Sequence, residues 1–111
     1  MADSYIEITA ENFAEKVLNS SQIVIVNFSA EQSSACKIQE PEFIALSKEY
    51  QDRITFAKAN VEGQEELTSR WQVDGVPTLI FFKDGNELHR IKGIVMRDKL
   101  RRQIEGVLLT Q

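Results

Sequence analysis

Two short apolar runs constrain the fold of this chain more than any other feature. Ile23–Phe28 reads IVIVNF, is apolar up to Asn27 and is rich in β-branched residues. Such a run is typical of a central strand covered on both faces, because a strand with one face in water alternates apolar and polar residues. Thr78–Lys83, which reads TLIFFK, is predicted to be a second apolar strand.

Strands and helices are predicted to alternate around these two runs. The Asp-Gly pair within Lys83–Glu87 indicates a hairpin, whose two strands must be antiparallel, whereas strands separated by helices favour parallel pairing. The order βαβαβαββα then predicts a mixed central sheet with helices on both faces, which is an α/β fold. The other expected strands are Tyr5–Ile8, Ile54–Val61 and Leu88–Lys92, and the expected helices are Ala10–Leu18, Ser34–Tyr50, Gln64–Trp71 and Arg97–Leu109.

Helix boundaries and faces follow from capping residues and from the spacing of apolar positions. Thr9 is a candidate N-cap of the first helix, and Pro41 is expected to kink the second because it lacks an N–H group. The residues expected to face the core are Phe13, Val17 and Leu18 in the first helix, Ile38, Phe43, Ile44 and Leu46 in the second, and Leu100, Ile104, Val107 and Leu108 in the last.

Length, charge and cysteine count exclude several classes of protein. At 111 residues we expect one domain, residues 1–111, without a disulfide framework. The net charge of −4 argues against nucleic acid as a partner, and Lys99, Arg101 and Arg102 are interpreted as the solvated face of the last helix. No apolar run is long enough to span a membrane, and the N-terminus does not resemble a signal peptide. With no signal peptide expected, the single cysteine favours a reducing, cytoplasmic location, and one cysteine with one histidine predicts no metal site.

Several segments, taken in order, resemble the thioredoxin family over nearly the whole chain. They are VIVNFSAE, CK followed by Pro41, FAKANVE with Lys58, GVPT with Pro77, and FFKDG with the later Gly93. The resemblance implies the thioredoxin fold. It also implies that Lys58 is the family's buried lysine, that Pro77 is its cis-proline, and that Pro41 marks the kink in its active-site helix.

The chain departs from the family at the redox motif. Where the family has Trp-Cys-Gly-Pro-Cys-Lys, Gln32–Lys37 reads QSSACK, so that only Cys36 and the lysine match. Ser29 replaces a tryptophan, and Asn27 replaces the buried aspartate that assists proton transfer to the second cysteine. The joint change at six positions indicates natural divergence, although a cysteine-to-serine change introduced at Ser33 alone stays open. The resemblance therefore implies a preserved scaffold with its chemistry replaced.

Dithiol exchange needs two sulfur atoms, one to attack the substrate disulfide and one to release the product. Ser33 occupies the position of the attacking cysteine, but a hydroxyl group needs an adjacent base. The only histidine, His89, is placed away from this helix start by the resemblance. We therefore predict no conventional protein-disulfide reductase, and we interpret Ser33 or Ser34 as a helix cap.

Cys36 has two interpretations. It is either a reactive single thiol or a small buried side chain, and the resemblance favours the second, since the family's second cysteine is the more shielded one. Lys37 follows it directly, but successive side chains on a helix point in different directions. Asn27 is expected to be a hydrogen-bonded polar residue of the core that cannot exchange a proton.

Two functional hypotheses follow, and neither requires a cofactor. In the first, the chain binds a protein or an extended peptide segment in the family's groove beside the cis-proline, by backbone hydrogen bonds that need no sulfur. In the second, it is a monothiol oxidoreductase or thiol redox sensor that acts through Cys36. The expected groove residues are Ser33, Ser34, Ala35, Val76, Pro77 and Thr78, supported by Asn27, Pro41 and Lys58.

Overall fold

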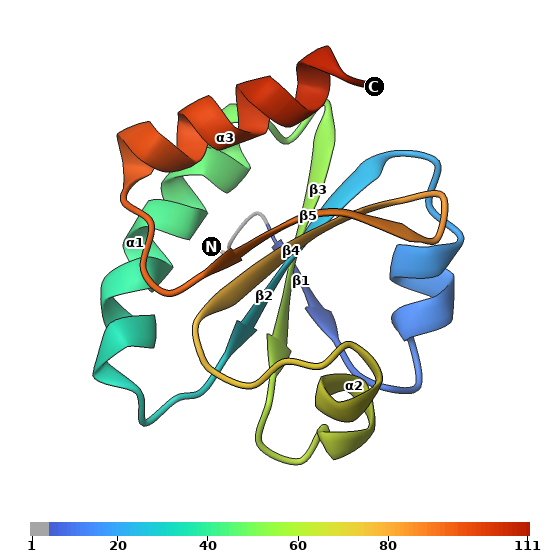
Figure 1. The fold of residues 1–111 in the computed structure, drawn as a ribbon, viewed down its shortest axis with the longest axis vertical. Coiled ribbons are helices and arrows are strands. Elements are labelled where there is room, and N and C mark those ends of the chain that lie inside the picture. The colour runs from blue at the N-terminus through green and yellow to red at the C-terminus, as the bar shows by residue number, and fades with distance from the viewer. Residues whose placement is uncertain (1–4) are drawn as a thin grey trace.

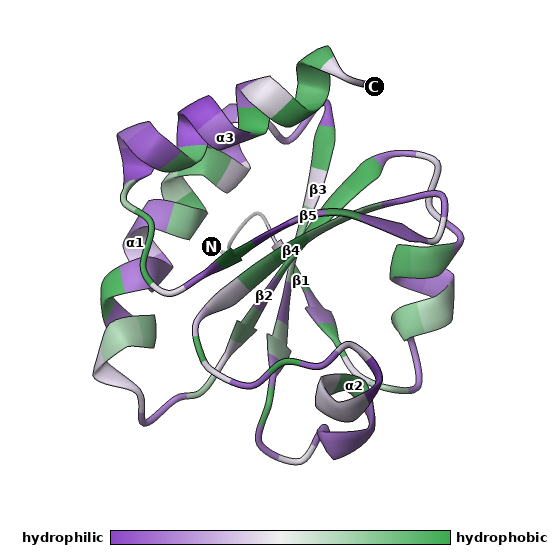
Figure 2. Ribbon diagram, in the orientation of Figure 1, coloured by the Kyte–Doolittle hydropathy of each residue, from purple (hydrophilic) through white to green (hydrophobic). Residues whose placement is uncertain are grey.

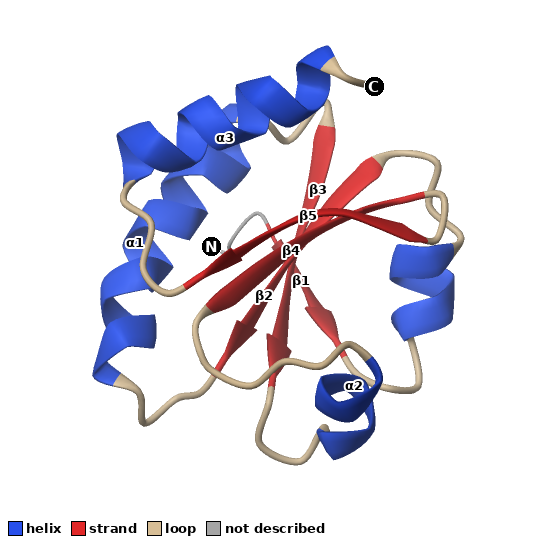
Figure 3. Cartoon of the chain, viewed as in Figure 1, coloured by secondary structure: helices blue, strands red, loops and turns tan. Residues whose placement is uncertain are grey.

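A five-stranded mixed sheet lies at the centre of the computed structural model, which describes residues 5–111 (Figure 3). The predicted α/β architecture, with helices on both faces of a mixed sheet, is confirmed (Figure 1). The elements are β1 (Tyr5–Ile8), the π-helical turn η1 (Ala14–Leu18), β2 (Ile23–Ser29), α1 (Ser34–Glu49), β3 (Ile54–Asn60), α2 (Glu65–Arg70), β4 (Thr78–Lys83), β5 (Asn86–Lys92) and α3 (Arg97–Leu109).

The strand order in the sheet is β1-β3-β2-β4-β5. Strand β3 is parallel to both β1 and β2, as predicted for strands separated by helices. The same prediction is wrong for β4, which is antiparallel to β2. The reason is the length of α2: six residues of helix rise only about 9 Å, whereas the seven residues of β3 extend about 23 Å. The chain therefore enters β4 from the end of the sheet at which it left β3.

A two-residue hairpin joins β4 to β5. Asp84 and Gly85 both have positive φ angles, 51° and 83°, as a type I′ turn requires. Lys83 pairs with Asn86 across this turn, so β5 begins two residues earlier than the predicted Leu88. The Asp-Gly prediction is confirmed, and the turn is tighter than expected.

Each face of the sheet has its own hydrophobic core. All seven residues of β2 are buried, which confirms the prediction of a strand covered on both sides. Figure 2 shows β2 and β4 mostly in green, whereas α3 alternates between purple and green, as a helix with one polar face does. One core contains Phe43 and Leu46 of α1 with Leu100 and Ile104 of α3, and the other contains Phe13 and Val17 near η1 with Leu67 of α2.

The segment predicted as the helix Ala10–Leu18 is shorter and wider than a regular α-helix. Turns precede Phe13, and Ala14–Leu18 forms a single π-helical turn. Thr9 caps the turn reciprocally: its N–H donates to Asn12 Oδ1 at 2.8 Å, and the Asn12 N–H donates to its Oγ1 at 3.4 Å. The predicted cap residue is thus correct, although the regular helix is not.

Helix α1 runs through Pro41 without a break, and the kink expected there stays a prediction. Its buried residues Cys36, Gln39, Phe43 and Leu46 recur every three or four positions and so form one face. Ile38 lies about 100° away from Gln39 around the helix and is 50% exposed, so its predicted core position is wrong.

Gln39 ties α1 to the loop between β5 and α3. Its Nε2 donates to the Val95 carbonyl at 3.0 Å, and the Val95 N–H donates to its Oε1 at 2.8 Å. The side chain is completely buried, so its amide satisfies two backbone groups that water cannot reach. Among residues 5–111, no helix has the length and apolar character needed to cross a bilayer.

Candidate functional site

The predicted groove residues leave the same end of two neighbouring strands. Phe28, near the end of β2, pairs with Thr78 at the start of β4. After Ser29 the chain turns into α1, and before Thr78 it passes through the Val76–Pro77 peptide bond, which is cis. Figure 1 shows the loop after β2 and the loop before β4 at the lower end of the sheet. The sheet therefore positions both halves of the candidate site.

Ser33 is the N-cap of α1. It has an extended backbone, with φ −83° and ψ 122°, and its Oγ accepts a hydrogen bond from the Cys36 N–H at 3.1 Å. This bond satisfies one of the N–H groups that the first helical turn leaves without a partner. The predicted cap is confirmed for Ser33, whereas Ser34 is exposed on the first turn.

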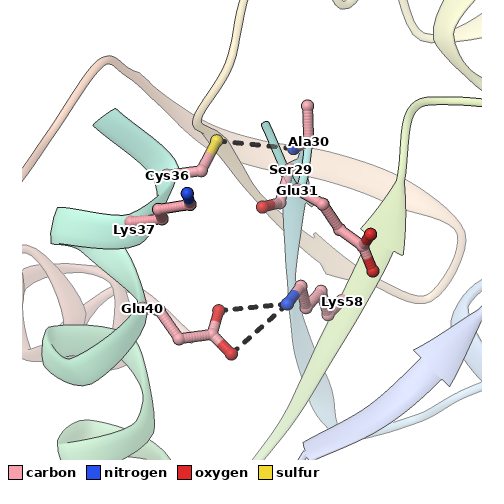
Figure 4. Close-up of a pocket in the computed structure, with 7 residues that line it drawn as sticks. All are labelled: Ser29, Ala30, Glu31, Cys36, Lys37, Glu40 and Lys58. Atoms are coloured by element: carbon pink, nitrogen blue, oxygen red, sulfur yellow. Dashed lines mark hydrogen bonds and ion pairs between the residues drawn. The ribbon is translucent and has the colours of Figure 1, made fainter. Parts of the chain in front are cut away.

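Cys36 is a free thiol with 4% of its surface exposed. Its Sγ accepts a hydrogen bond from the Ala30 N–H at 3.4 Å, drawn as a dashed line in Figure 4. The predicted burial of this residue is confirmed. The sulfur is held against the loop that leads from β2 to α1.

An open pocket of about 250 Å³ lies between the start of α1 and the sheet (Figure 4). Lys37 lines it together with Cys36, so the prediction that Lys37 points elsewhere is wrong in this respect. The pocket is wide enough to contact both side chains, which lie in the first turn of α1. Its lining residues are Ser29, Ala30, Glu31, Cys36, Lys37, Glu40 and Lys58.

A polar cluster around Glu40 forms the inner part of this pocket. Lys58 Nζ contacts both carboxylate oxygens of Glu40, at 3.1 and 3.3 Å, and the Tyr5 hydroxyl donates to Glu40 Oε2 at 3.2 Å. The sequence analysis did not identify Glu40. The signal was present, because Glu40 stands four residues after Cys36 and thus on the same side of the helix.

Asn27 is completely buried, and neither atom of its amide group has a hydrogen-bond partner within the described residues. The prediction of a hydrogen-bonded core residue is therefore wrong. Asn27 is paired in register with Lys58 on β3, but the ammonium group of Lys58 reaches across to Glu40 on α1 instead. The carboxylate that balances this lysine thus comes from the helix and not from β2.

Two hydrogen bonds hold the loop before β4, and the backbone groups of one of its residues form none within residues 5–111. Thr78 Oγ1 donates to the Gly75 carbonyl at 2.7 Å, and the Gly93 N–H donates to the Pro77 carbonyl at 2.9 Å. Pro77 and Thr78 are buried, whereas Val76 is half-buried. Within residues 5–111, neither the N–H nor the C=O group of Val76 forms a hydrogen bond.

Within residues 5–111, the Ser33 hydroxyl is hydrogen-bonded to the Cys36 N–H and to no basic side chain. His89 is on β5, where its Nε2 is 2.6 Å from Gln103 Oε1 and its ring packs edge-on against Phe81. Its predicted separation from the start of α1 is confirmed. The geometry thus gives Ser33 a capping role and provides no group to activate it.

Known proteins match this chain over nearly its whole length. The Thioredoxin family pattern matches residues 4–106. The chain is 38% identical over 104 residues to Thioredoxin X, chloroplastic, of Arabidopsis thaliana, covering 92% of this chain and 57% of that protein. It is 33% identical over 96 residues to a thioredoxin of Buchnera aphidicola, covering 86% of this chain and 89% of that one.

The fold is shared with a solved structure. The crystal structure of Malassezia sympodialis thioredoxin (Mala s 13) superposes with a TM-score of 0.85 at 25% sequence identity, covering 95% of this chain and 91% of the other. On sequence and structure together, the chain belongs to the thioredoxin family and has the thioredoxin fold.

Proposed function

We propose that this chain is a thioredoxin-like protein that binds an extended segment of a partner protein without dithiol chemistry. The partner would lie in the groove formed by Ser33, Ser34, Ala35, Val76, Pro77 and Thr78. A reducing compartment such as the cytoplasm suits this function, because the single thiol stays reduced there.

The observation that carries the proposal is the free backbone of Val76. Its N–H and C=O groups are unpaired within residues 5–111, although the residues beside it are hydrogen-bonded in place. An extended peptide offers the complementary donor and acceptor, in the mode by which strands are added to sheets. Half-burial of the Val76 side chain leaves apolar surface beside these groups for a partner side chain.

The thiol chemistry of the family has no complete counterpart here. Disulfide exchange through a dithiol requires two sulfurs, and the position of the first is occupied by the capping hydroxyl of Ser33. The second, Cys36, is 4% exposed and is turned toward the Ala30 N–H. These features support binding as the function of the groove.

The test is a pull-down from native lysate, carried out both with and without excess reductant. The wild-type chain and Cys36→Ala should retain the same partners, whereas Val76→Lys should lose them, because a charged side chain would obstruct the free backbone groups. Leu109→Lys is the matched control, since Leu109 is 86% exposed at the end of α3 and should bind as wild type. If the Val76→Lys variant retained the same partners as wild type, the proposal would be contradicted.

A second candidate is a monothiol function of Cys36, and the pocket of Figure 4 favours it. A thiol that faces a 250 Å³ pocket together with Glu40 and Lys58 has an ion pair near it that could assist proton transfer. This candidate makes the opposite prediction in the same experiment. Partners would be lost from Cys36→Ala and released from wild type when reductant is added.

A further inference from the structure

A shallow trough lies between β5 and α3, on a part of the molecule that shares no residue with the groove beside Pro77. It has a volume of about 370 Å³, and in Figure 1 the helix α3 runs above β5. Strand β5 is the last strand of the sheet, and within residues 5–111 nothing pairs with its outer side. The lining residues are Leu88, His89, Arg102, Gln103, Gly106, Val107 and Thr110.

Gly106 lies inside α3, and no contact among residues 5–111 requires a glycine there. Glycine is the least favourable residue in a helix interior after proline. Apart from its chain neighbours and the adjacent backbone of α3, no heavy atom of the described residues lies within 4 Å of the place a Cβ atom would take, and the φ angle is not positive. Neither packing nor backbone conformation therefore requires glycine here. Its effect is to leave the floor of the trough open, as is common where another backbone approaches closely.

The trough is lined by a positively charged side chain, Arg102, that has no ion-pair partner among the described residues. Arg102 is exposed and forms no ion pair or hydrogen bond with any described residue, whereas its neighbour Arg101 contacts both Glu49 and Asp98. On β5, the carboxylate of Glu87 is already bound by Arg90, so it does not neutralise Arg102.

We propose that the outer edge of β5 and this trough bind an extended acidic segment of a partner protein. The segment would add a sixth strand beside β5 by backbone hydrogen bonds, with a carboxylate on Arg102 and its chain over Gly106. A second copy of this chain fits less well, because a two-fold interface places the same patch on both sides and would bring the two Arg102 side chains together.

The experiment is an NMR titration of the uniformly ¹⁵N-labelled chain with the peptide acetyl-Glu-Val-Glu-Val-Glu-amide. Saturable shifts are expected for the amides of Asn86–Lys92 and Gly106, with a dissociation constant below about 1 mM. Arg102→Glu should weaken binding at least about tenfold. Lys48→Glu makes the same charge change on an exposed residue of α1 and should leave the affinity within about twofold of wild type.

Gly106→Leu tests the open floor, and its melting temperature should equal or exceed that of wild type, because the space is empty and glycine disfavours helix. It should abolish the shifts on β5. The proposal is overturned if no shifts appear at peptide concentrations up to about 2 mM, if acetyl-Lys-Val-Lys-Val-Lys-amide binds equally well, or if Arg102→Glu and Lys48→Glu behave alike. Shifts that depend on protein concentration without peptide would assign the edge to a second copy instead.

Discussion

At position 33, a hydroxyl group stands where the family's motif has its attacking thiol, and it caps α1. A serine accepts a hydrogen bond from a backbone N–H without being ionised, so the helix start is preserved while the nucleophile is lost. Cys36, one turn later, is packed in the interior, with 4% of its surface exposed. Under the proposed function, these two residues keep the scaffold of a thiol site without its dithiol reaction.

Asn27 is expected to destabilise the chain. Its amide is fully buried and has no hydrogen-bond partner among residues 5–111, and an unsatisfied buried polar group costs about 1–3 kcal/mol. Asn27→Leu, which has a similar shape, should therefore raise the free energy of unfolding by about 1 kcal/mol or more. Urea denaturation measures this change.

Asn12 provides the matched control for this substitution. Its side chain makes two hydrogen bonds around the turn before η1, from the Thr9 N–H and to the Glu7 carbonyl, so Asn12→Leu should lower the free energy of unfolding. If Asn27→Leu proved as destabilising as Asn12→Leu, the amide of Asn27 would have a hidden partner, such as a bound water molecule, and its unpaired state would be refuted.

At the residue scale, local chemistry was predictable and long-range chemistry was not. Thr9 and Ser33 were identified as caps because a cap bonds to a residue three positions away. The Glu40–Lys58 pair and the buried amide of Gln39 depend on which strand or loop lies opposite α1. That arrangement is set by the sheet, and no local pattern encodes it.

At the scale of elements, Gln39 holds the β5–α3 loop on α1. Gln39→Ala removes both of its hydrogen bonds and leaves the buried N–H and C=O groups of Val95 without partners. We expect the free energy of unfolding to fall by about 2–4 kcal/mol. Ile38→Ala, at the exposed neighbouring position, should change it by less than about 0.5 kcal/mol. Equal losses for both variants in urea denaturation would contradict the assigned role of Gln39.

Tyr50, at the end of α1, forms a hydrogen bond with Glu105 of α3, so the stability of this contact should decrease at alkaline pH. Burial, together with a hydrogen bond to the carboxylate of Glu105, raises the pKa of Tyr50 from 10 to about 12. The folded state therefore keeps the phenol proton where the unfolded chain releases it. This contribution to stability is complete below pH 10 and is lost as the pH rises toward 12.

Thermal unfolding at several pH values between 9 and about 12 measures this effect. Tyr50→Phe, which has no phenol proton, should show a smaller decrease in melting temperature across that range than wild type. Identical pH dependence in the two proteins would show that another group is responsible.

Periodicity predicted the type of most elements but not their directions. The apolar runs at β2 and β4 and the Asp84-Gly85 turn identified strands and hairpin, because these signals are local. The antiparallel direction of β4 depends on α2 being too short to return along the sheet. The π-helical turn of η1 also lacked a signal, since its apolar spacing matches that of an α-helix.

At the scale of the whole molecule, the sheet and its two cores are those of the thioredoxin family, and the departures lie at one end of the sheet. The groove beside Pro77 and the trough beside β5 draw on different residues, so the two binding proposals can fail independently. The central claim is that the scaffold of the redox site is intact and that one missing thiol removes its activity.

Insulin reduction in the presence of a chemical reductant tests this claim most directly, with wild type, Ser33→Cys and Ser34→Cys compared. Wild type and Ser34→Cys should show no turnover. Ser33→Cys places a second thiol at the start of α1, one turn from Cys36, where a disulfide can close. It should become active, at a rate about 10²–10⁴ below that of a dithiol thioredoxin, because Asn27 cannot relay a proton. A wild-type rate within about tenfold of such an enzyme, or a Ser33→Cys variant that neither forms the internal disulfide nor turns over, would contradict the account.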